Sequence, residues 1–423
     1  MTKINVLIFP AGEVNSIELH DALASCVNIN VYGASSIDRH GSYVFKNYIS
    51  GLPLISSNEF FEKFNEVLAE KKIDLVFPTH DTVATVLADN ADRIRAKIIS
   101  ADKRTSAICR DKLKTYELFA DCDFIPKIYS KIETFPVFIK PIEGQGAIGA
   151  QLINSSKDVP NVDLGEYVIC EYLPGKEYTV DCLTDKNGNL RFISPRSRNR
   201  IMAGISVASE IEEVTTEIQN IAEKINNRLA FLGLWWFQIK QNQNGKWILL
   251  EISTRCAGTM ALTRARGINL PLLSVYTAMG YEISVEPNFY HVKMDSSLIR
   301  RYTIDYNYDI VYFDFDDTIT LRGNVNLKAI WFLYQCQNYG KKVILITKHE
   351  KDIYKTMNLY HIDKGLFNRI IHIKPEDKKS DFINPYKAIF IDNSYQERDE
   401  VRKIHNIPVF DVDGLDTLMD WRY

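Results

Sequence analysis

Apolar and polar positions alternate along the first part of the chain in a way typical of a parallel sheet with helices between its strands. Residues 5–10 form an apolar run that predicts a strand, and residues 17–23 have the apolar spacing of a helix. Apolar runs at 27–33 and 73–78 predict further strands. Strands that alternate with helices favour parallel, right-handed connections. We therefore expect an α/β domain at the amino end.

The turn after the first predicted strand, Ala11-Gly12, lacks the G-x-G-x-x-G spacing that lets a backbone approach a pyrophosphate closely. A dinucleotide site is therefore not expected. The segment from Pro78 to Asp81 lies at the end of another predicted strand, where a substrate can bind. A helix cap at Thr79 or Asp81 explains the same residues equally well.

A glycine-rich segment follows a predicted strand in the next part of the chain. Residues 135–141 form that strand and place Lys140 near its end. Gly144, Gly146 and Gly149 come next and give a flexible loop whose backbone N–H groups can close over phosphates. The same pattern is common in hairpin turns. The loop alone therefore leaves both interpretations open.

Two further pairs of strands are predicted downstream. Residues 167–181 form two apolar runs around a Pro-Gly turn. Residues 234–239 and 247–255 predict an antiparallel hairpin, because the connecting residues 241–246 are rich in turn formers. These pairs distinguish the middle of the chain from its α/β beginning.

The last apolar runs each end in a residue with a reactive or metal-binding side chain. Residues 309–313 predict a buried strand that leads into Asp314 and Asp316, and two later runs end in Thr347 and Asp392. In an open α/β sheet the carboxyl ends of the strands face the ligand, and two carboxylates two residues apart can reach one cation. An isolated acidic pair is also typical of a solvated turn, so the prediction depends on the complete set.

The bulk composition of the 423-residue chain is that of an ordinary globular protein and excludes several classes. Hydrophobic residues make up 46% and charged residues 25%, with a formal net charge of −3, so nothing indicates a nucleic-acid partner. The 7 cysteines lack C-x-x-C spacing and favour reduced thiols over a disulfide framework or a zinc site. No apolar run is long enough to span a membrane, and the amino end has no signal-peptide pattern. We expect a cytoplasmic protein of roughly two to four domains with no membrane partner.

The order and spacing of Lys140, the glycine-rich loop and the hairpin that carries Glu251 resemble the ATP-grasp superfamily over about residues 1–300. The resemblance is specifically to its carbamoyl-phosphate-synthase-like and amino-acid-ligase-like members. It implies a Rossmann-like pre-ATP-grasp domain over residues 1–105 and an α+β ATP-grasp domain over residues 106–304. The cofactors implied are ATP and Mg²⁺, with Mn²⁺ as an alternative ion.

The resemblance also implies a nucleotide site. Lys112 and Lys140 would contact the ATP phosphates, and the glycine-rich loop would cover them. The adenine pocket would be lined, mainly through backbone groups, by Glu171, Tyr172 and Leu173. Glu177 would bind the ribose hydroxyls.

Metal and substrate sites follow from the same resemblance. Gln238 and Glu251 would hold Mg²⁺. Arg255 would meet the γ-phosphate or the acyl phosphate as a catalytic residue. Arg196 and Arg198 would bind the substrate carboxylate.

The chain departs from the family's usual metal-binding end, Glu-x-Asn-x-Arg, which here reads Glu251-Ile252-Ser253-Thr254-Arg255. A serine hydroxyl thus replaces an amide oxygen. Gln238 is also neutral where many relatives carry glutamate. Both changes lower the negative charge available to Mg²⁺.

The set of residues at the carboxyl end resembles the haloacid-dehalogenase (HAD) phosphatase superfamily. The resemblance implies that Asp314 is the nucleophile and that Asp316 protonates the leaving oxygen. Thr347 would hold the phosphoryl oxygens, and Lys379 would offset their charge. Asp392 would join Asp314 and the carbonyl group of Asp316 around Mg²⁺.

This second resemblance covers residues 305–423 and implies a HAD-type Rossmannoid domain. Of Lys374, Lys378 and Lys379, the last has the register that fits best. Asn393 stands where the common form has a second acid, so one carboxylate is missing. The stretches between the motifs are too short to hold a cap, so we expect a capless site that is open to solvent.

The leading hypothesis is a bifunctional enzyme. Its ATP-dependent ligase would activate a carboxylate as an acyl phosphate for attack by an amine or another nucleophile, and its second domain would hydrolyse a phosphorylated substrate with Mg²⁺. One alternative keeps the grasp chemistry but makes the product a phosphorylated small molecule. Another is an ATP-grasp kinase or ligase whose HAD-like domain is a non-catalytic binding or assembly module. The sequence leaves the substrates and the oligomeric state open, a homodimer included.

Overall fold

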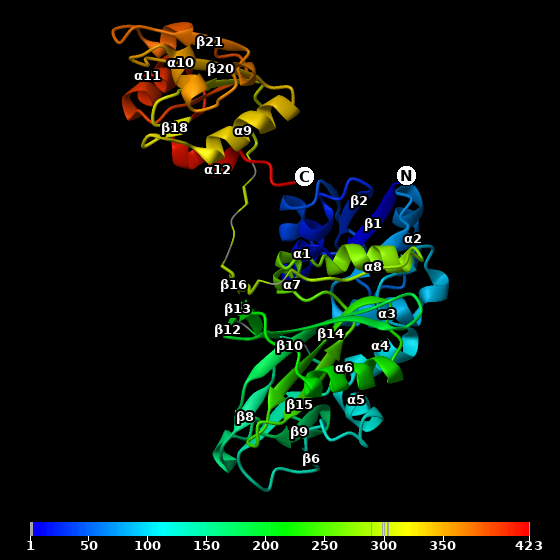
Figure 1. Ribbon diagram of the computed structural model, residues 1–423. Helices are drawn as coiled ribbons and strands as arrows, with labels where there is room; N and C mark the ends of the chain where they lie inside the picture. Colours follow the sequence, from blue (N-terminus) through cyan, green and yellow to red (C-terminus); the bar gives the residue numbers. More distant parts are fainter. Residues whose placement is uncertain are drawn as a thin grey trace. The chain divides into compact units, whose positions relative to one another are not determined.

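The computed structural model describes residues 3–422, apart from residues 145, 203, 289, 298, 300 and 303. The chain divides into two compact units, residues 1–298 and residues 299–422 (Figure 1). This division falls slightly before the expected boundary at 304/305. One contact that ties the preceding residues to the second unit is that of Arg301, whose guanidinium lies 4.2 Å from the ring centre of Trp421.

The first sheet has five parallel strands in the order β3-β2-β1-β4-β5. Their bounds are Ile4–Phe9 for β1, Ile29–Ala34 for β2, Asn47–Ile49 for β3, Leu75–Pro78 for β4 and Lys97–Ile98 for β5. Four helices pack on this sheet: α1 (Val14–Leu23), α2 (Phe60–Glu70), α3 (Asp81–Asp89) and α8 (Leu270–Ala278). The strands at 5–10, 27–33 and 73–78 were thus correctly predicted within a few residues.

Alternation along β1 explains why helices cover both faces of this sheet. Val6 and Ile8 belong to a core cluster that includes residues of α1 and α8. Leu7 and Phe9 belong to another cluster with residues of α2 and α3. Because successive side chains of a strand point to opposite faces, an unbroken apolar run needs a helix layer on each side.

Two antiparallel four-stranded sheets follow, in the orders β6-β9-β7-β8 and β11-β10-β14-β15. The smaller comprises β6 (Ile128–Tyr129), β7 (Val137–Pro141), β8 (Gln151–Ile153) and β9 (Tyr167–Glu171). The larger comprises β10 (Glu177–Thr184), β11 (Leu190–Ser197), β14 (Gly233–Gln241) and β15 (Trp247–Ser253). The predicted hairpin is the β14–β15 pair.

The two strands predicted around the Pro-Gly turn are present, but they do not pair with each other. β9 lies in the smaller sheet and β10 in the larger one. The intervening Gly175 donates its N–H to the carbonyl of Gln241 at the end of β14, at 3.0 Å. The turn therefore carries the chain from one sheet to the other instead of reversing it.

The larger sheet shares its core with the first sheet. Leu234 and Trp236 of β14 lie in the same cluster as Val6 and Ile8 of β1. On the opposite face, Trp235 and other apolar residues pack against α6 (Thr216–Arg228). The expected domains 1–105 and 106–304 therefore lie in one compact unit as far as residue 298.

The remaining elements of this unit are short. They are the helices α4 (Lys103–Arg110), α5 (Lys112–Leu118) and α7 (Ala261–Ala265), and a small antiparallel sheet of β12 (Arg200–Met202), β13 (Ile205–Glu210) and β16 (Lys293–Asp295).

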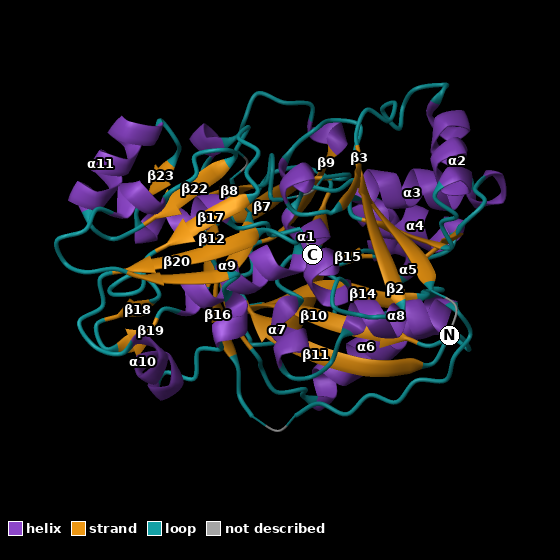
Figure 2. Ribbon diagram, turned by 90° about the horizontal axis from the view of Figure 1, so that it is seen from above, coloured by secondary structure: helices purple, strands orange, loops and turns teal. Residues whose placement is uncertain are grey.

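The second unit is built on a parallel sheet in the order β21-β20-β17-β22-β23; Figure 2 labels β20, β17, β22 and β23. Its strands are β17 (Ile310–Phe313), β20 (Lys342–Thr347), β21 (Arg369–His372), β22 (Ala388–Ile391) and β23 (Val409–Phe410). The chain between β17 and β20 forms the hairpin of β18 (Thr320–Leu321) and β19 (Asn324–Val325) and then the helix α9 (Leu327–Asn338).

Helices cover both faces of this sheet as well. α9, α10 (Ile353–Leu359) and α12 (Leu415–Leu418) pack on one face, and α11 (Tyr395–His405) packs on the other. The three strands predicted at 309–313, 343–347 and 388–391 are adjacent in it and end at the same edge. Among the described residues of the whole chain, no helix is long and apolar enough to cross a membrane.

Candidate active sites

A cavity of about 900 Å³ lies within the first unit. Residues that follow β1, β2 and β4 line one part of it, and residues of the two four-stranded sheets, of β12 and β13 and of nearby loops line other parts. Every residue predicted for a site in this unit lines the cavity except Gly149. Those that do are Lys112, Lys140, Gly144, Gly146, Glu171, Tyr172, Leu173, Glu177, Arg196, Arg198, Gln238, Glu251 and Arg255.

Two buried lysines carry the positive charge of the cavity's inner wall. Lys140, near the end of β7, donates to the hydroxyl of Tyr116 at 2.7 Å and to the carbonyl of Leu250 at 3.0 Å. Lys112, at the start of α5, lies 3.4 Å from the carbonyl oxygen of Ile142. Burial lowers the pKa of both ammonium groups, and the charge of Lys140 lowers the pKa of Lys112 further. Two desolvated, mutually repelling cations are stabilised by an anionic ligand such as a phosphate.

Strand alternation and register bring the predicted metal ligands together. Thr179 of β10 lies opposite Gln238 of β14, and Gln238 lies opposite Glu251 of β15. All three line the cavity, whereas Val180, one position along β10, joins the core on the other face. The amide and the carboxylate expected to hold Mg²⁺ are thus direct neighbours across two strands.

The donor set fits a metal that a nucleotide helps to hold. Gln238 and Glu251 supply one amide oxygen and one carboxylate. Mg²⁺ is commonly bound by one or two carboxylates together with substrate phosphates. Across the described part of the chain, no group of three or more His, Cys, Asp or Glu side chains is arranged to hold a metal ion. These residues therefore fit a Mg²⁺ ion that arrives with a nucleotide.

Glu177, the predicted ribose contact, is surrounded by donors. Its carboxylate lies 2.8 Å from Nε of Arg198 and 3.2 Å from Nζ of Lys240, and it accepts a hydrogen bond from Gln238. These contacts hold the carboxylate against the cavity wall. Its role toward a ribose stays a prediction.

Both arginines predicted to bind the substrate carboxylate already pair with acids. Arg196 is buried and makes two contacts with Asp181, at 2.9 and 3.0 Å, and a third with Thr259. Arg198 pairs with Glu177. Arg196 is therefore a fixed part of the cavity wall, and a substrate carboxylate would have to share either guanidinium with its present partner.

Arg255, the predicted catalytic arginine, is held by an acid from the first sheet. Its Nη2 lies 2.9 Å from Oδ2 of Asp81, and its Nη1 donates to the carbonyl of Cys256 at 3.1 Å. Its guanidinium also lies 5.5 Å from the ring centre of Trp236. Burial acts to raise the pKa of Asp81, but the Arg255 guanidinium outweighs the effect of burial, so the pKa of Asp81 is lowered.

The glycine-rich loop meets a second glycine turn. A Cβ atom at Gly204, between β12 and β13, would overlap the carbonyl oxygen of Gly146. Gly204 and Gly146 both have positive φ, +77° and +61°. The two backbones can therefore lie in contact only because Gly204 has no side chain, whereas a Cβ atom at Gly146 would meet no other atom within 4 Å. Gln145, inside the loop, lies outside the described residues.

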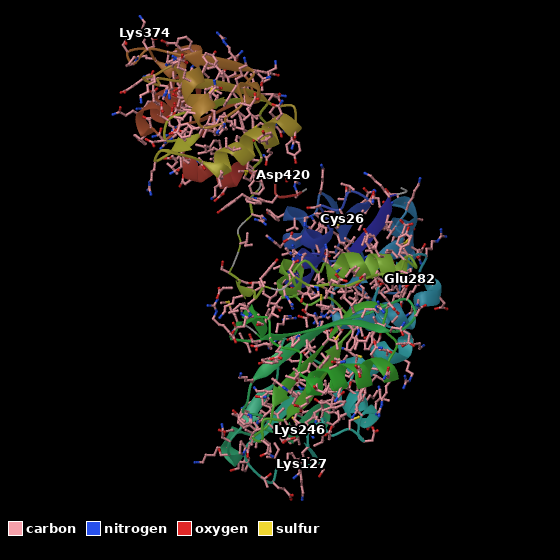
Figure 3. All side chains as sticks on the ribbon, viewed as in Figure 1. Cys26, Lys127, Lys246, Glu282, Lys374 and Asp420 are labelled. Atoms are coloured by element: carbon pink, nitrogen blue, oxygen red, sulfur yellow. The ribbon has the colours of Figure 1, made fainter. Side chains whose placement is uncertain are left out.

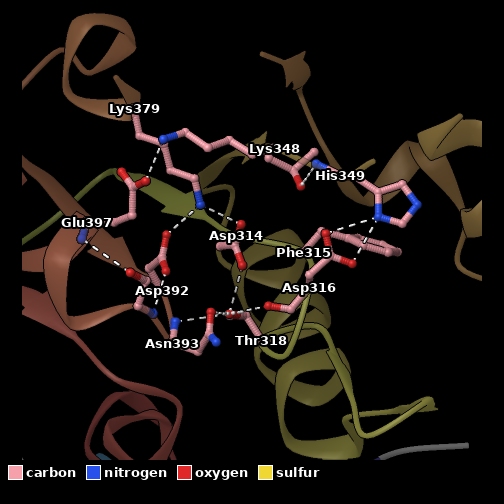
Figure 4. Close-up of polar contacts among 12 residues, drawn as sticks. Asp314, Phe315, Asp316, Thr318, Lys348, His349, Lys379, Asp392, Asn393 and Glu397 are labelled. Carbon is pink, nitrogen blue, oxygen red and sulfur yellow. Dashed lines mark hydrogen bonds and ion pairs between the residues drawn. The ribbon is translucent and has the colours of Figure 1, made fainter. Parts of the chain in front are cut away.

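In the second unit, one lysine joins two of the predicted acids (Figure 4). Nζ of Lys379 lies 2.6 Å from Oδ1 of Asp314 and 2.6 Å from Oδ2 of Asp392. All three side chains are buried. Lys378 is exposed, and so is Lys374, which lies at the outer rim of the unit (Figure 3). Lys379 is thus the lysine that reaches the acidic pair.

Asp316 points away from that group and pairs with a histidine (Figure 4). Its two carboxylate oxygens lie 2.9 and 3.0 Å from Nδ1 of His349, and Nε2 of His349 lies 2.7 Å from Oγ1 of Thr356. The backbone N–H of His349 donates to the buried hydroxyl of Thr347 at 3.1 Å. Half of the Asp316 side chain is exposed. A proton on this acid is therefore at the solvent edge of the site.

Thr318 connects the remaining residues of this edge. Its hydroxyl lies 3.0 Å from Oδ2 of Asp314, 3.3 Å from the carbonyl oxygen of Asp316 and 3.3 Å from Oδ1 of Asn393. Burial raises the pKa of Asp314 to about 7, although the Lys379 ammonium acts in the opposite direction. A divalent cation beside Asp314 would favour its ionised form. Two carboxylates and one carbonyl oxygen at a strand edge are oxygen ligands of the kind Mg²⁺ takes.

Comparison with known proteins bears on the first unit. A family model described as ATP-grasp in the biosynthetic pathway with Ter operon matches residues 163–298. Solved structures with a similar fold include the biotin carboxylase of Campylobacter jejuni in a β,γ-ATP complex (TM-score 0.55, 15% identity, 66% of this chain and 72% of that chain). The L-amino acid ligase of Bacillus licheniformis is another (TM-score 0.52, 14% identity, 66% and 75%). The smaller unit is too short to supply such a share of the chain. The first unit has an ATP-grasp fold.

Curated relatives of this chain are ligases. A 3-methyl-D-ornithine–L-lysine ligase of Methanosarcina mazei is 25% identical over 152 residues, which are 36% of this chain and 40% of that protein. A D-alanine–D-alanine ligase of Thermotoga petrophila is 30% identical over 139 residues, 29% of this chain and 46% of that protein. The chain thus spans less than half the length of the curated relatives it matches. The first unit, whose fold and partial family match are those of ATP-grasp proteins, is hereafter called the ATP-grasp unit.

Three residues of the two sites had no assigned role in the sequence analysis. Asp81 was weighed only as a helix cap or a strand-end residue, although His80 is the cap of α3. Its partner Arg255 is 174 positions away, so no local pattern reveals the contact. Thr318 and His349 were detectable in principle, because each lies within a few residues of a predicted catalytic residue.

Proposed function

We propose that the ATP-grasp unit is an ATP-dependent ligase that activates a carboxylate as an acyl phosphate for attack by an amine or another nucleophile. The observation that carries this proposal is the cavity in which two desolvated lysines lie beside one carboxylate and one amide. Basic side chains outnumber acidic ones among the described residues that line it: Arg39, Lys112, Lys140, Arg196, Arg198, Lys240 and Arg255, against Glu13, Glu171, Glu177 and Glu251.

Each part of this wall has a task in that reaction. Lys112 and Lys140 would neutralise phosphate oxygens, and Arg255 would bind the transferring phosphoryl group. Gln238 and Glu251 would hold Mg²⁺, which supplies Lewis-acid neutralisation of the phosphate charge. The glycine-rich loop would exclude water, which would otherwise hydrolyse an acyl phosphate. The curated ligases that the chain resembles support carboxylate–amine chemistry.

The test is ADP release by the full chain with Mg²⁺ and a panel of amino acids and other small carboxylates, with and without amines. We expect ADP release to depend on one carboxylate and to be lost in Glu251→Gln. Hydroxylamine should trap an acyl phosphate as a hydroxamate. ADP release without hydroxamate would favour the alternative in which this unit is a kinase.

We further propose that residues 299–422 form a HAD-like phosphohydrolase with a capless site. The support is the buried group of Asp314, Lys379 and Asp392 at one edge of a parallel sheet, with Asp316 beside it. Asp314 would attack the phosphorus atom and form an aspartyl phosphate while the leaving oxygen takes a proton from Asp316. Thr347 and Lys379 would bind the phosphoryl oxygens.

The two proposed activities, nucleotide-dependent ligation and phosphate ester hydrolysis, can be separated experimentally. In the full chain, Asp314→Asn should abolish release of phosphate from p-nitrophenyl phosphate with Mg²⁺ and leave ATP binding unchanged. One observation favours the second candidate, a non-catalytic binding module: Asn393 stands in place of an acid, which weakens the site for a metal. A wild-type chain that binds Mg²⁺ but hydrolyses no phosphomonoester would support that candidate instead.

A further inference from the structure

Asp81 links the parallel sheet of the ATP-grasp unit to the end of β15. It is the first residue of α3, which follows β4. Its Oδ1 accepts a hydrogen bond from Oγ of Ser253 at 2.8 Å, and its Oδ2 accepts one from Nη2 of Arg255 at 2.9 Å. One carboxylate thus holds both Ser253, the last residue of β15, and Arg255, which lies just beyond that strand. Asp81 itself does not line the cavity.

The contacts of Arg255 fix its guanidinium but leave it one donor. Asp81, the carbonyl of Cys256 and the ring of Trp236 restrain it from three directions. Its Nε is buried and has no hydrogen-bond partner within the described part of the chain. Since a buried N–H without a partner costs free energy, a ligand acceptor at this position would be favoured.

Ser253 explains why an acid is needed here. A serine has no amide to orient a neighbouring guanidinium, and its hydroxyl is committed to Asp81. Glu251, two residues earlier on the strand, is on the phosphate side of the cavity with Lys112 and Lys140. Without Asp81, no described acidic side chain makes an ion pair with Arg255.

We propose that Asp81 is a positioning residue of the ligase site, which orients Arg255 toward the terminal phosphoryl group. One oxygen of its carboxylate accepts a hydrogen bond from Arg255, and the other accepts one from Ser253, which holds the carboxylate in place. This inference rests on the proposed function of the ATP-grasp unit. Asp81 touches neither substrate nor metal and acts through Arg255. A ligand that carries a third phosphoryl group should therefore sense the loss of Asp81, whereas a ligand that ends at the second should not.

The experiment compares two nucleotides on the full chain with Mg²⁺: ADP and the non-hydrolysable ATP analogue adenylyl imidodiphosphate. Asp81→Asn keeps the size of the side chain but removes the charge. We expect it to weaken binding of the analogue by about tenfold, the scale of one charge-assisted hydrogen bond, and to change ADP binding less than about twofold. In an Arg255→Gln background, Asp81→Asn should have no further effect on either nucleotide.

The chain offers a matched control. Glu18 of α1 pairs with Arg264 of α7 through two contacts, at 2.9 and 2.8 Å, and is also largely buried, but neither residue lines the cavity. Glu18→Gln should lower the melting temperature and leave the ratio of the two nucleotide affinities unchanged. If Asp81→Asn does not fold, Ser253→Ala serves as the second variant and should shift the ratio in the same direction by a smaller factor.

The outcomes separate this inference from the function on which it rests. Binding of the analogue that is unchanged in Asp81→Asn, or weakened equally with ADP, would overturn the positioning role while leaving the nucleotide site intact. An effect that persists in the Arg255→Gln background would also overturn it. A wild-type chain that binds neither nucleotide would overturn the proposed function and this inference together.

Discussion

Nζ of Lys379 lies 2.6 Å from Oδ1 of Asp314, although 65 positions separate the two residues in the chain. The pair is buried, and the same ammonium also contacts Asp392. The two carboxylates raise the pKa of Lys379, although burial acts against them. The lysine therefore allows two acids to lie together at the ends of β17 and β22. Under the proposed function it would also bind a phosphoryl oxygen.

The first prediction concerns stability. Lys379→Met leaves Asp314 and Asp392 buried without their cation, which should destabilise the second unit by about 3–5 kcal/mol. Lys348→Met breaks a more exposed pair with Glu397 on the same unit and should cost about 1 kcal/mol or less. Hydrogen exchange of peptides from β17 and β22 measures both. Equal exchange in the two variants would show that the buried Lys379 pairs contribute no more stability than the more exposed pair of Lys348 and Glu397.

The second prediction concerns the acid of the proposed phosphatase. His349 orients the carboxylate of Asp316, so His349→Ala should slow hydrolysis of alkyl phosphates, whose leaving oxygen needs a proton, by about ten- to a hundredfold. Hydrolysis of p-nitrophenyl phosphate, whose leaving group is more acidic, should fall much less. Steady-state rates with the two substrates give the ratio. A uniform loss with both would assign His349 a purely structural role.

The third prediction concerns the phosphate wall of the ATP-grasp unit. Lys140→Met should weaken ATP binding by about ten- to a hundredfold, because it removes a charge-assisted contact in a desolvated site. Lys246, at the turn between β14 and β15, is the control: it pairs with Asp123 at the surface, and Lys246→Met should not change ATP binding (Figure 3). Calorimetric titration measures both. Unchanged affinity in Lys140→Met would remove the phosphate assignment.

The fourth prediction concerns the contact between the two glycine turns. Gly204→Ala places a methyl group against the carbonyl oxygen of Gly146 and should displace the glycine-rich loop. Gly188→Ala is the matched control, because Gly188 has a similar positive φ of +83° but open space around a Cβ. Both substitutions carry a backbone strain of roughly 1 kcal/mol, and Gly204→Ala adds the steric overlap, so it should lower the melting temperature more than Gly188→Ala. Only Gly204→Ala should alter nucleotide affinity and protease cleavage within the loop.

Local pattern was sufficient for most of the strands, and it placed candidate site residues at their ends. The strands ending at Asp314, Thr347 and Asp392 were predictable because each is a buried apolar run that stops at a polar residue. Lys140 and Glu251 were singled out by the resemblance to the ATP-grasp superfamily; both line the cavity, and their roles stay predictions. For these strands the informative residues are close neighbours in sequence, whereas the ATP-grasp resemblance needed the order of several strands along the chain.

Contacts between distant segments were not predictable in this way. The apolar runs of β9 and β10 flank a turn that a hairpin would also use, and only the packing of Gly175 against β14 sends them to different sheets. The pairing of Arg196 with Asp181 needs the register of β10 and β11, which a single sequence does not give. The link from Asp81 to Arg255 depends on how two sheets pack, so no spacing rule can reveal it.

The walls of the cavity come from one parallel and three antiparallel sheets, so a molecule that fills it contacts segments that are far apart along the chain. Its binding free energy would then raise the unfolding free energy of the ATP-grasp unit as a whole, by about 2.7 kcal/mol at a ligand concentration a hundred times the Kd. The second unit has a core of its own. Heating the protein with a nucleotide should therefore split its unfolding into two steps. Occupancy of the first site becomes visible without any turnover, and compounds can be screened as substrates before the reaction is known.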